Sequence, residues 1–209
     1  MIINCRNQLG VTLIEMMIAM LLGLFVSAAA ITVFITSFSA NSDAIELMQM
    51  NQELRASSMM MSRDIRRHGY TTGDVTANNY ASNILIGTTD ISALAATSTA
   101  TSVVTGSCLW IAYDEGSARR GYRVQGDEVQ YLNEALGGTS TCASGNWQPL
   151  TDSNIANIDV ANSSFTATKF SNSVISIIDI EIDLVATSSS GDFTRNLTTT
   201  ARVRNDSAN

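Results

Sequence analysis

Basic residues are scarce in this sequence of 209 residues. It has 12 Lys and Arg against 19 Asp and Glu, and its formal net charge is −7 at pH 7. A chain with this excess of acid has little attraction to phosphate backbones or anionic lipid, so we do not expect a nucleic-acid partner. Arg119, Arg120 and Arg123 form a local basic patch. Three arginines in an acidic domain are more often solvated loop charges than a DNA contact.

Residues that could perform catalysis or bind a metal are equally few. His68 is the sole histidine, and the sequence has no glycine-rich phosphate loop, catalytic triad or cluster of metal ligands, so we do not expect an enzyme. Asp179, Glu181 and Asp183 alternate with apolar residues and would share one face of a strand. Because side chains along a flat strand do not surround an ion, a solvated outer face is favoured over a cation site. We expect no cofactor.

The most prominent feature that is present is an apolar run. Residues 16–38 are uncharged and mostly apolar. As a helix they would extend about 35 Å at ~1.5 Å per residue, which is enough to cross a hydrocarbon core of ~30 Å. The alternative is a secretory signal peptide with Arg6 in its N-terminal region and a cleavage site ending at Ala30. The run continues past Ala30 through "ITVFITSF", which a cleaved signal does not require, so a retained membrane helix is favoured.

The start of this run carries a more specific signal. "QLGVTLIEMMIAMLLGLF" resembles the type IV prepilin signature, in which a short polar leader ends in Gly and precedes an apolar helix with Glu at its fifth position. The resemblance implies that a prepilin peptidase cuts between Gly10 and Val11 and that the new amino group of Val11 is methylated. Val11 departs from the Phe of most family members. Residues 1–10 would be the cleaved leader, and residues 11–40 the helix of the membrane and filament core.

Glu15 is an acid in an otherwise uncharged segment. A carboxylate there costs roughly 2.5 to 3.5 kcal/mol at mid-bilayer and less near the interface. Where prepilin-like helices pack side by side in a filament, this carboxylate can pair with the free N-terminal amine of a neighbour. The pair would select one axial register, so Glu15 is predicted to be an assembly residue. The alternative is a glutamate that is tolerated in the headgroup layer because it lies at the end of the span.

A second helical pattern follows the apolar run. Residues 41–70 contain no Pro, and no Gly before Gly69, which predicts that the helix continues to about His68. Its apolar residues form a stripe of the kind that covers a sheet: Leu47, Met50, Leu54, Met61 and Ile65. The consecutive methionines at 59–61 are interpreted as flexible core filler and not as a metal-binding methionine box.

The rest of the chain changes to strand-like patterns. Residues 71–106 are rich in Ser, Thr, Ala, Asn and Gly and predict a long loop with one short strand at "NILIG". Over residues 107–209, "CLWIAYD", "RGYRVQ" and "EVQYLNEA" predict strands, with "QGDE" as a tight hairpin between the last two. "SVISIIDIEIDLVATS" and "FTRNLTTTARVR" predict two longer strands joined at "SSGD". The predicted fold is α+β and pilin-like, with a long N-terminal helix packed on a C-terminal antiparallel sheet.

Two cysteines, Cys108 and Cys142, remain once a leader that contains Cys5 is removed. An even pair in a domain on the outer side of a membrane predicts a disulfide, which would constrain the unfolded chain by roughly 4 kcal/mol. A thiol nucleophile is the alternative. It is disfavoured because His68 would have to come from the far end of a helix to activate the thiol.

Features along the whole chain resemble a narrower family. The helix ending "SRDIRRHGY", the Cys-containing strand after a Ser/Thr-rich loop and the closing "ARVRND" resemble the PilW family of minor pilins, which is similar to J-type pseudopilins of type II secretion. The resemblance implies a subunit of a pilus tip or initiation complex that primes assembly of the major pilin, for twitching, adhesion or DNA uptake. Its partners would be prepilin peptidase, the major pilin and other minor pilins.

The same resemblance implies a location. The protein would lie in the inner membrane through residues 16–38, with its C-terminal domain in the periplasm, and would then enter the pilus at the cell surface. The first alternative is a secretion pseudopilin of J type. The second is a soluble secreted binding domain that a signal peptidase releases after Ala30.

Overall fold

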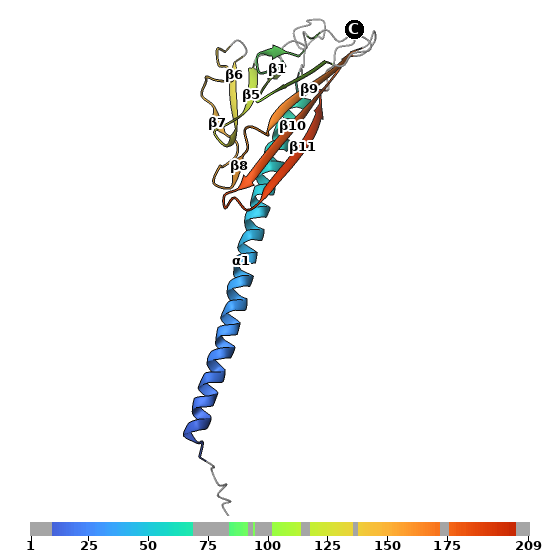
Figure 1. Cartoon of the computed structure of the whole chain (residues 1–209). Coiled ribbons are helices and arrows are strands. Elements are labelled where there is room, and N and C mark those ends of the chain that lie inside the picture. The colour runs from blue at the N-terminus through green and yellow to red at the C-terminus, as the bar shows by residue number, and fades with distance from the viewer. Residues whose placement is uncertain are drawn as a thin grey trace, which may run out of the picture. The chain divides into compact units, whose positions relative to one another are not determined.

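The computed structural model describes residues 10–68, 84–91, 94, 102–113, 118–135, 138–171 and 176–203. The chain divides into two compact units, Met1–Ile45 and Glu46–Asn209. The helix α1, Leu13–Arg66, begins in the first unit and ends in the second, and Figure 1 colours it from blue to teal. It therefore covers almost all of the predicted span. Gly69, the predicted stop, lies outside the described residues.

The strands all belong to the second unit. In the part of the chain that the structure describes they are β1 (Leu85–Ile86), β2 (Thr89–Asp90), β3 (Ser102–Gly106), β4 (Cys108–Tyr113), β5 (Ala118–Gln125), β6 (Glu128–Ala135), β7 (Gln148–Pro149), β8 (Ala156–Ile158), β9 (Ser164–Ser171), β10 (Ser176–Ser188) and β11 (Thr194–Arg202). Every pairing between them is antiparallel.

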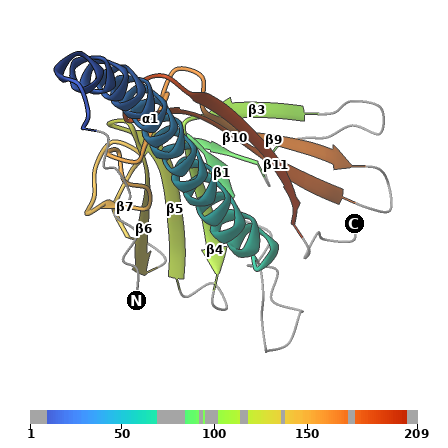
Figure 2. The same cartoon turned by 90° about the horizontal axis from the view of Figure 1, so that it is seen from below.

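These strands form two sheets, where the sequence predicted one. The first sheet has the order β2-β1-β4-β5-β6-β7, and the second has the order β11-β10-β9-β3, with β8 also paired to β10. Figure 2 shows the two groups of strands on either side of the teal, C-terminal part of α1. Side chains from both sheets and from this part of the helix share one hydrophobic core. The predicted α+β fold, a long helix packed on antiparallel strands, is confirmed.

The face of α1 that packs on the sheets is the predicted apolar stripe. Its residues are buried or packed against the core: Leu47, Met50, Leu54, Met61 and Ile65. Between Leu54 and Met61 the buried face is completed by Ser57 and Ser58, whose hydroxyls donate to backbone carbonyls within the helix. Met59 is 63% exposed, so the prediction that it fills the core is wrong. Residues two apart on a helix lie on nearly opposite sides, and burial of Met61 therefore turns Met59 outward.

Strand β10 shows the alternation that the sequence predicted. Its inward residues are all nearly inaccessible: Ile178, Ile180, Ile182, Leu184 and Ala186. Asp179, Glu181 and Asp183 lie between them on the other face and are half-buried. On β11, Arg202 donates two hydrogen bonds of 2.8 Å to Asp179, and Thr198 donates one to Asp183. No cluster of three or more His, Cys, Asp or Glu residues within the described ranges could hold a metal.

The hairpin between β5 and β6 is also as predicted. Gly126 and Asp127 form its two-residue turn with backbone φ angles of 64° and 63°. Positive φ at both central residues is the requirement of a type I′ turn, whose twist matches that of the flanking strands, and a Gly-Asp pair meets it.

The short strand predicted at "NILIG" is confirmed as β1, but the loop prediction for the rest of residues 71–106 is wrong where β2 and β3 lie. β3 pairs with β9, a strand that the sequence patterns also missed. The sequence of β3, "SVVTG", is short and lies in a Ser- and Thr-rich region, so its extended form depends on pairing with residues about 60 positions away. Gly106 ends the strand where a Cβ would lie 2.8 Å from the Ile86 side chain, which explains a small residue there.

Candidate processing and assembly site

The predicted cleavage site lies just before the first turn of α1. Gly10, Val11 and Thr12 are exposed and precede the helix. Thr12 caps the helix, because its Oγ1 accepts a hydrogen bond of 3.3 Å from the backbone N–H of Glu15 and its carbonyl accepts one of 3.2 Å from Met16. Thr followed by Glu three residues later has the spacing of a capping box. The pattern "TLIE" carries this signal, and sequence reasoning missed it.

Gly10 has no structural need to be glycine. A Cβ placed on it would have no heavy atom within 4 Å, and its backbone is outside the left-handed region. A glycine that the fold does not require is consistent with a requirement imposed by another molecule. A peptidase that must approach the backbone closely would impose one, since only glycine leaves that backbone uncovered. Cleavage between Gly10 and Val11 stays a prediction.

The described part of the first unit, residues 10–45, has almost no buried surface of its own. Its large apolar side chains between Val11 and Phe38 are 52% to 79% exposed. Among the described residues α1 is the helix long and apolar enough to cross a membrane, and none of its most apolar window, with mean hydropathy 2.6, is buried. Thr32 and Thr36 donate their hydroxyls to carbonyls of the preceding turn, so these polar groups are satisfied without water.

Glu15 lies in the first turn of α1, where the helix dipole favours a negative charge by about 0.3 to 1 kcal/mol. No described side chain forms an ion pair with its carboxylate. The position is compatible with the predicted pairing to a neighbour's amine and equally with a role in capping its own helix. A substitution that removes the charge and keeps the hydrogen-bond acceptor separates these two roles.

The structure joins Cys108 and Cys142 in a disulfide, with their Cα atoms 5.8 Å apart, as the sequence predicted. Neither is a free thiol, which excludes the nucleophile alternative. On the face of the first sheet away from α1, Cys108 belongs to a small second core with Trp110, Leu132 and Trp147. The disulfide therefore ties the segment that carries Cys142 onto this face.

Two arginines of β5 complete this small core. Arg119 lies 4.3 Å from the ring centre of Trp110, and Arg123 lies 4.5 Å from that of Trp147. The two indoles meet edge to face at 5.2 Å over Gly121, where a Cβ would lie 2.7 Å from both rings. Such contacts between a cation and a ring contribute about 0.5 to 2 kcal/mol each.

The same guanidinium groups also hold the chain around Cys142. Arg119 donates to the carbonyls of Gly138 and Ser140, both at 2.7 Å, and Arg123 donates to the carbonyl of Cys142 at 2.8 Å. The prediction that these arginines are solvated loop charges is wrong. They belong to a strand and fix the backbone of the segment that the disulfide tethers.

Arg120 points to the opposite side of β5, toward α1. Arg120 and the hydroxyl of Tyr122 both donate to the carboxylate of Asp64 on α1. Burial and the hydrogen bond to Asp64 raise the pKa of Tyr122, which stays protonated. Burial, the largest single influence, disfavours the charged guanidinium, but the hydrogen bonds and charge interactions with Asp64 and Tyr122 together outweigh it and raise the pKa of Arg120. The network of Asp64, Arg120 and Tyr122, which sequence reasoning missed, ties the helix to the first sheet.

Two glutamates on α1 hold loops of the second unit. Glu46 accepts hydrogen bonds of 2.8 Å from the backbone of Ser190 and the hydroxyl of Ser189, and these bonds lower the pKa of Glu46. Glu53 accepts from the backbone of Asp152. Burial raises the pKa of Glu53. Both contacts fix connections between strands to the helix.

A capped apolar helix preceded by an unconstrained glycine, together with a helix-packed antiparallel domain, defines a type IV prepilin-like protein. The comparisons agree, since the model of the prokaryotic N-terminal methylation motif matches residues 5–31 and that of prepilin peptidase-dependent protein B matches residues 43–204. The second match covers more than half of the chain, and the chain belongs to the prepilin peptidase-dependent protein B family. No curated protein and no solved structure gave a match.

Proposed function

We propose that this protein is a minor type IV pilin, a structural subunit without catalytic activity that enters a pilus tip or initiation complex and helps to prime assembly of the major pilin. The observation that carries the proposal is the apolar helix. Its large apolar side chains from Leu13 to Phe38 are exposed and need a membrane, and then neighbouring helices, to cover them. Family membership supports processing by prepilin peptidase. The resemblance of the sequence to the PilW family supports the minor-pilin class.

The disulfide supports a periplasmic place for the second unit, because such bonds persist in oxidising compartments outside the inner membrane. In the proposed pathway the peptidase removes residues 1–10, and residues 16–38 then anchor the chain in the inner membrane until assembly. On assembly the Glu15 carboxylate pairs with the N-terminal amine of a neighbouring subunit. Because both charges leave water, the pair forms in one axial register only.

The test compares Glu15→Ala with the wild-type chain in the native host. We expect the variant to be processed and stable in the inner membrane and nearly absent from sheared surface filaments. Truncation of one partner of a buried pair costs roughly 3 to 5 kcal/mol. At about 1.4 kcal/mol per factor of ten, incorporation falls by about two orders of magnitude or more. Immunoblots of the membrane and filament fractions measure this ratio.

Glu15→Gln is the matched control for helix capping, because Gln serves at this position of a capping box but carries no charge. If pairing is the role of Glu15, the Gln variant is lost from filaments as the Ala variant is. Normal recovery of Glu15→Gln alone would assign the residue to the cap, and normal recovery of both would make it a bystander at the membrane surface.

A further inference from the structure

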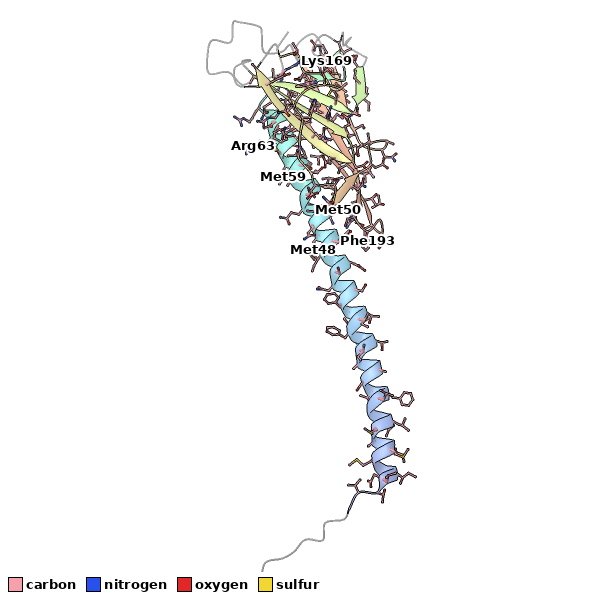
Figure 3. All side chains as sticks on the ribbon, turned by 90° about the vertical axis from the view of Figure 1, so that its left-hand side faces the viewer. Met48, Met50, Met59, Arg63, Lys169 and Phe193 are labelled. Carbon is pink, nitrogen blue, oxygen red and sulfur yellow. A yellow bond between two sulfur atoms is a disulfide. The ribbon has the colours of Figure 1, made fainter. Side chains whose placement is uncertain are left out.

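A groove runs along the domain part of α1, on the flank that does not pack on the sheets. Its walls come from the helix and from the start of β11: Met48, Gln52, Arg55, Ala56, Met59 and Arg195. All of these residues belong to the second unit. In Figure 3, Met59 and the nearby Arg63 lie on the side of α1 that faces away from the strands. The groove is thus open to other molecules.

Two of the wall residues are large apolar side chains in contact with solvent. Met48 is 69% exposed and Met59 is 63% exposed, whereas Met50 and Met61, two residues further along in each case, are fully buried. Methionine adapts its shape to varied surfaces and is common where proteins bind several partners. The pattern of one buried and one exposed methionine, repeated about three turns apart, places apolar contact surface on both sides of this helix segment.

The charged residues that line the groove are both arginines, although the protein as a whole is acidic. Arg55 and Arg195 are exposed, and within the described ranges neither guanidinium has a hydrogen bond or an ion pair. Glu46 and Glu53, on the same helix, are already bonded to loop backbone. Because a guanidinium recognises carboxylates with a forked pair of donors, the groove is complementary to an acidic surface with an apolar centre.

We propose that this groove binds another pilin-like subunit through a surface that presents carboxylates around apolar side chains. The proposal rests on the proposed function and names a contact surface for it that lies outside the apolar helix. An anionic membrane is the weaker alternative, since binding to anionic lipid takes clusters of about four to eight basic residues and this groove has two arginines.

The test places a photo-cross-linking amino acid at position 59 of the full chain in the native cell envelope. After irradiation, adducts are identified by mass spectrometry. We expect an adduct with a different chain that carries a methylated prepilin N-terminus. The double variant Arg55→Glu, Arg195→Glu should lower its yield by roughly tenfold, because two exposed attractions become repulsions. The double variant Arg66→Glu, Arg67→Glu, which makes the same charge change at two exposed residues outside the groove, should leave the yield unchanged.

Reversal of a cross-linked carboxylate in the partner to Arg should restore the adduct of the double variant. Adducts with lipid only, adducts with another copy of this chain only, absence of any adduct, or a yield insensitive to the double charge reversal would each overturn the proposal. Recovery of the chain in the filament fraction distinguishes failure of the groove proposal from failure of the proposed minor-pilin function. If the wild-type chain is recovered in filaments without the adduct, only the groove is refuted, whereas a chain never found in filaments refutes the minor-pilin role.

Discussion

The two units of this protein bury apolar surface in opposite ways. In Met1–Ile45 the large apolar side chains are exposed along the helix, and polar groups such as Thr32 are bonded within it. In Glu46–Asn209 one core unites the helix with both sheets, and a second core lies under the disulfide-tethered segment. The same helix passes through both units, so its secondary structure does not set this difference.

The two units differ in whether the partners of their apolar and charged side chains come from the same chain. The second unit supplies its own partners, as the network of Asp64, Arg120 and Tyr122 shows. The first unit leaves an uncovered apolar surface, a Glu15 carboxylate with no ion pair to a described side chain, and a glycine that the fold does not require. Substitutions in the first unit should therefore change processing and assembly without unfolding the domain, and substitutions in the second should change stability first.

The largest effect is expected at Gly10. Gly10→Val adds a branched side chain next to the predicted scissile bond, where the fold itself offers free space. We expect the variant to keep its leader completely, to fold its domain normally and to be missing from filaments. Mass spectrometry of the membrane-extracted protein measures this, since the wild-type chain should begin at a methylated Val11. A wild-type chain that begins at Ile31 would instead establish cleavage by signal peptidase and remove the prepilin interpretation.

A smaller effect, on stability alone, is expected from Asp64→Ala. It removes the carboxylate to which the mostly buried guanidinium of Arg120 and the hydroxyl of Tyr122 donate, and loss of one partner of a buried pair costs roughly 3 to 5 kcal/mol. Thermal unfolding of the detergent-solubilised chain measures the loss. Arg202→Met is the matched control, because its ion pair with Asp179 is more exposed and contributes about 0 to 1 kcal/mol. Equal losses in the two variants would contradict a special role for the buried network.

The parts of the fold that the sequence predicted correctly are local. The apolar stripe of α1, the alternation of β10 and the Gly126-Asp127 turn each depend on residues close in the chain. The missed strands, β3 and β9, pair with each other although they are about 60 residues apart in the chain. Their sequences are too short or too polar to predict a strand on their own. The division into two sheets depends on such distant pairings, which one sequence does not reveal.

The candidate site divides in the same way. Gly10, Val11 and Glu15 could be proposed as site residues because they lie within one short motif, and their roles stay predictions. The disulfide could be predicted because two cysteines remain outside the predicted leader. The contacts of Arg119, Arg120 and Arg123 could not be predicted. Asp64 and Arg120 are 56 residues apart in the chain, so their contact depends on how the helix packs on the first sheet. A basic cluster in a sequence does not reveal which side of a strand each arginine takes.

The smallest expected effect concerns pH and belongs to the second unit. His68, at the end of α1, is buried, and burial lowers its pKa to about 4, although the backbone of Ala112 and the charge of Asp90 act in the opposite direction. The unfolded chain, with an ordinary pKa near 6.5, then binds more protons between about pH 4 and 6.5. The contribution of His68 to the free energy of unfolding is therefore at its maximum above pH 6.5 and decreases as the pH falls. The decrease is about 2 kcal/mol at pH 5.

Thermal unfolding of the solubilised chain from pH 7.5 to pH 5 should show this loss, and His68→Gln should remove it, whatever its effect on stability at pH 7.5. Glu53, whose pKa is raised by burial, changes stability in the opposite direction above pH 4.5. The carboxylates with lowered pKa act below that range: Glu46, Asp152, Asp159 and Asp179. The comparison between the two chains therefore isolates His68. An unchanged pH dependence in His68→Gln would show that the buried imidazole does not control the acid response of the second unit.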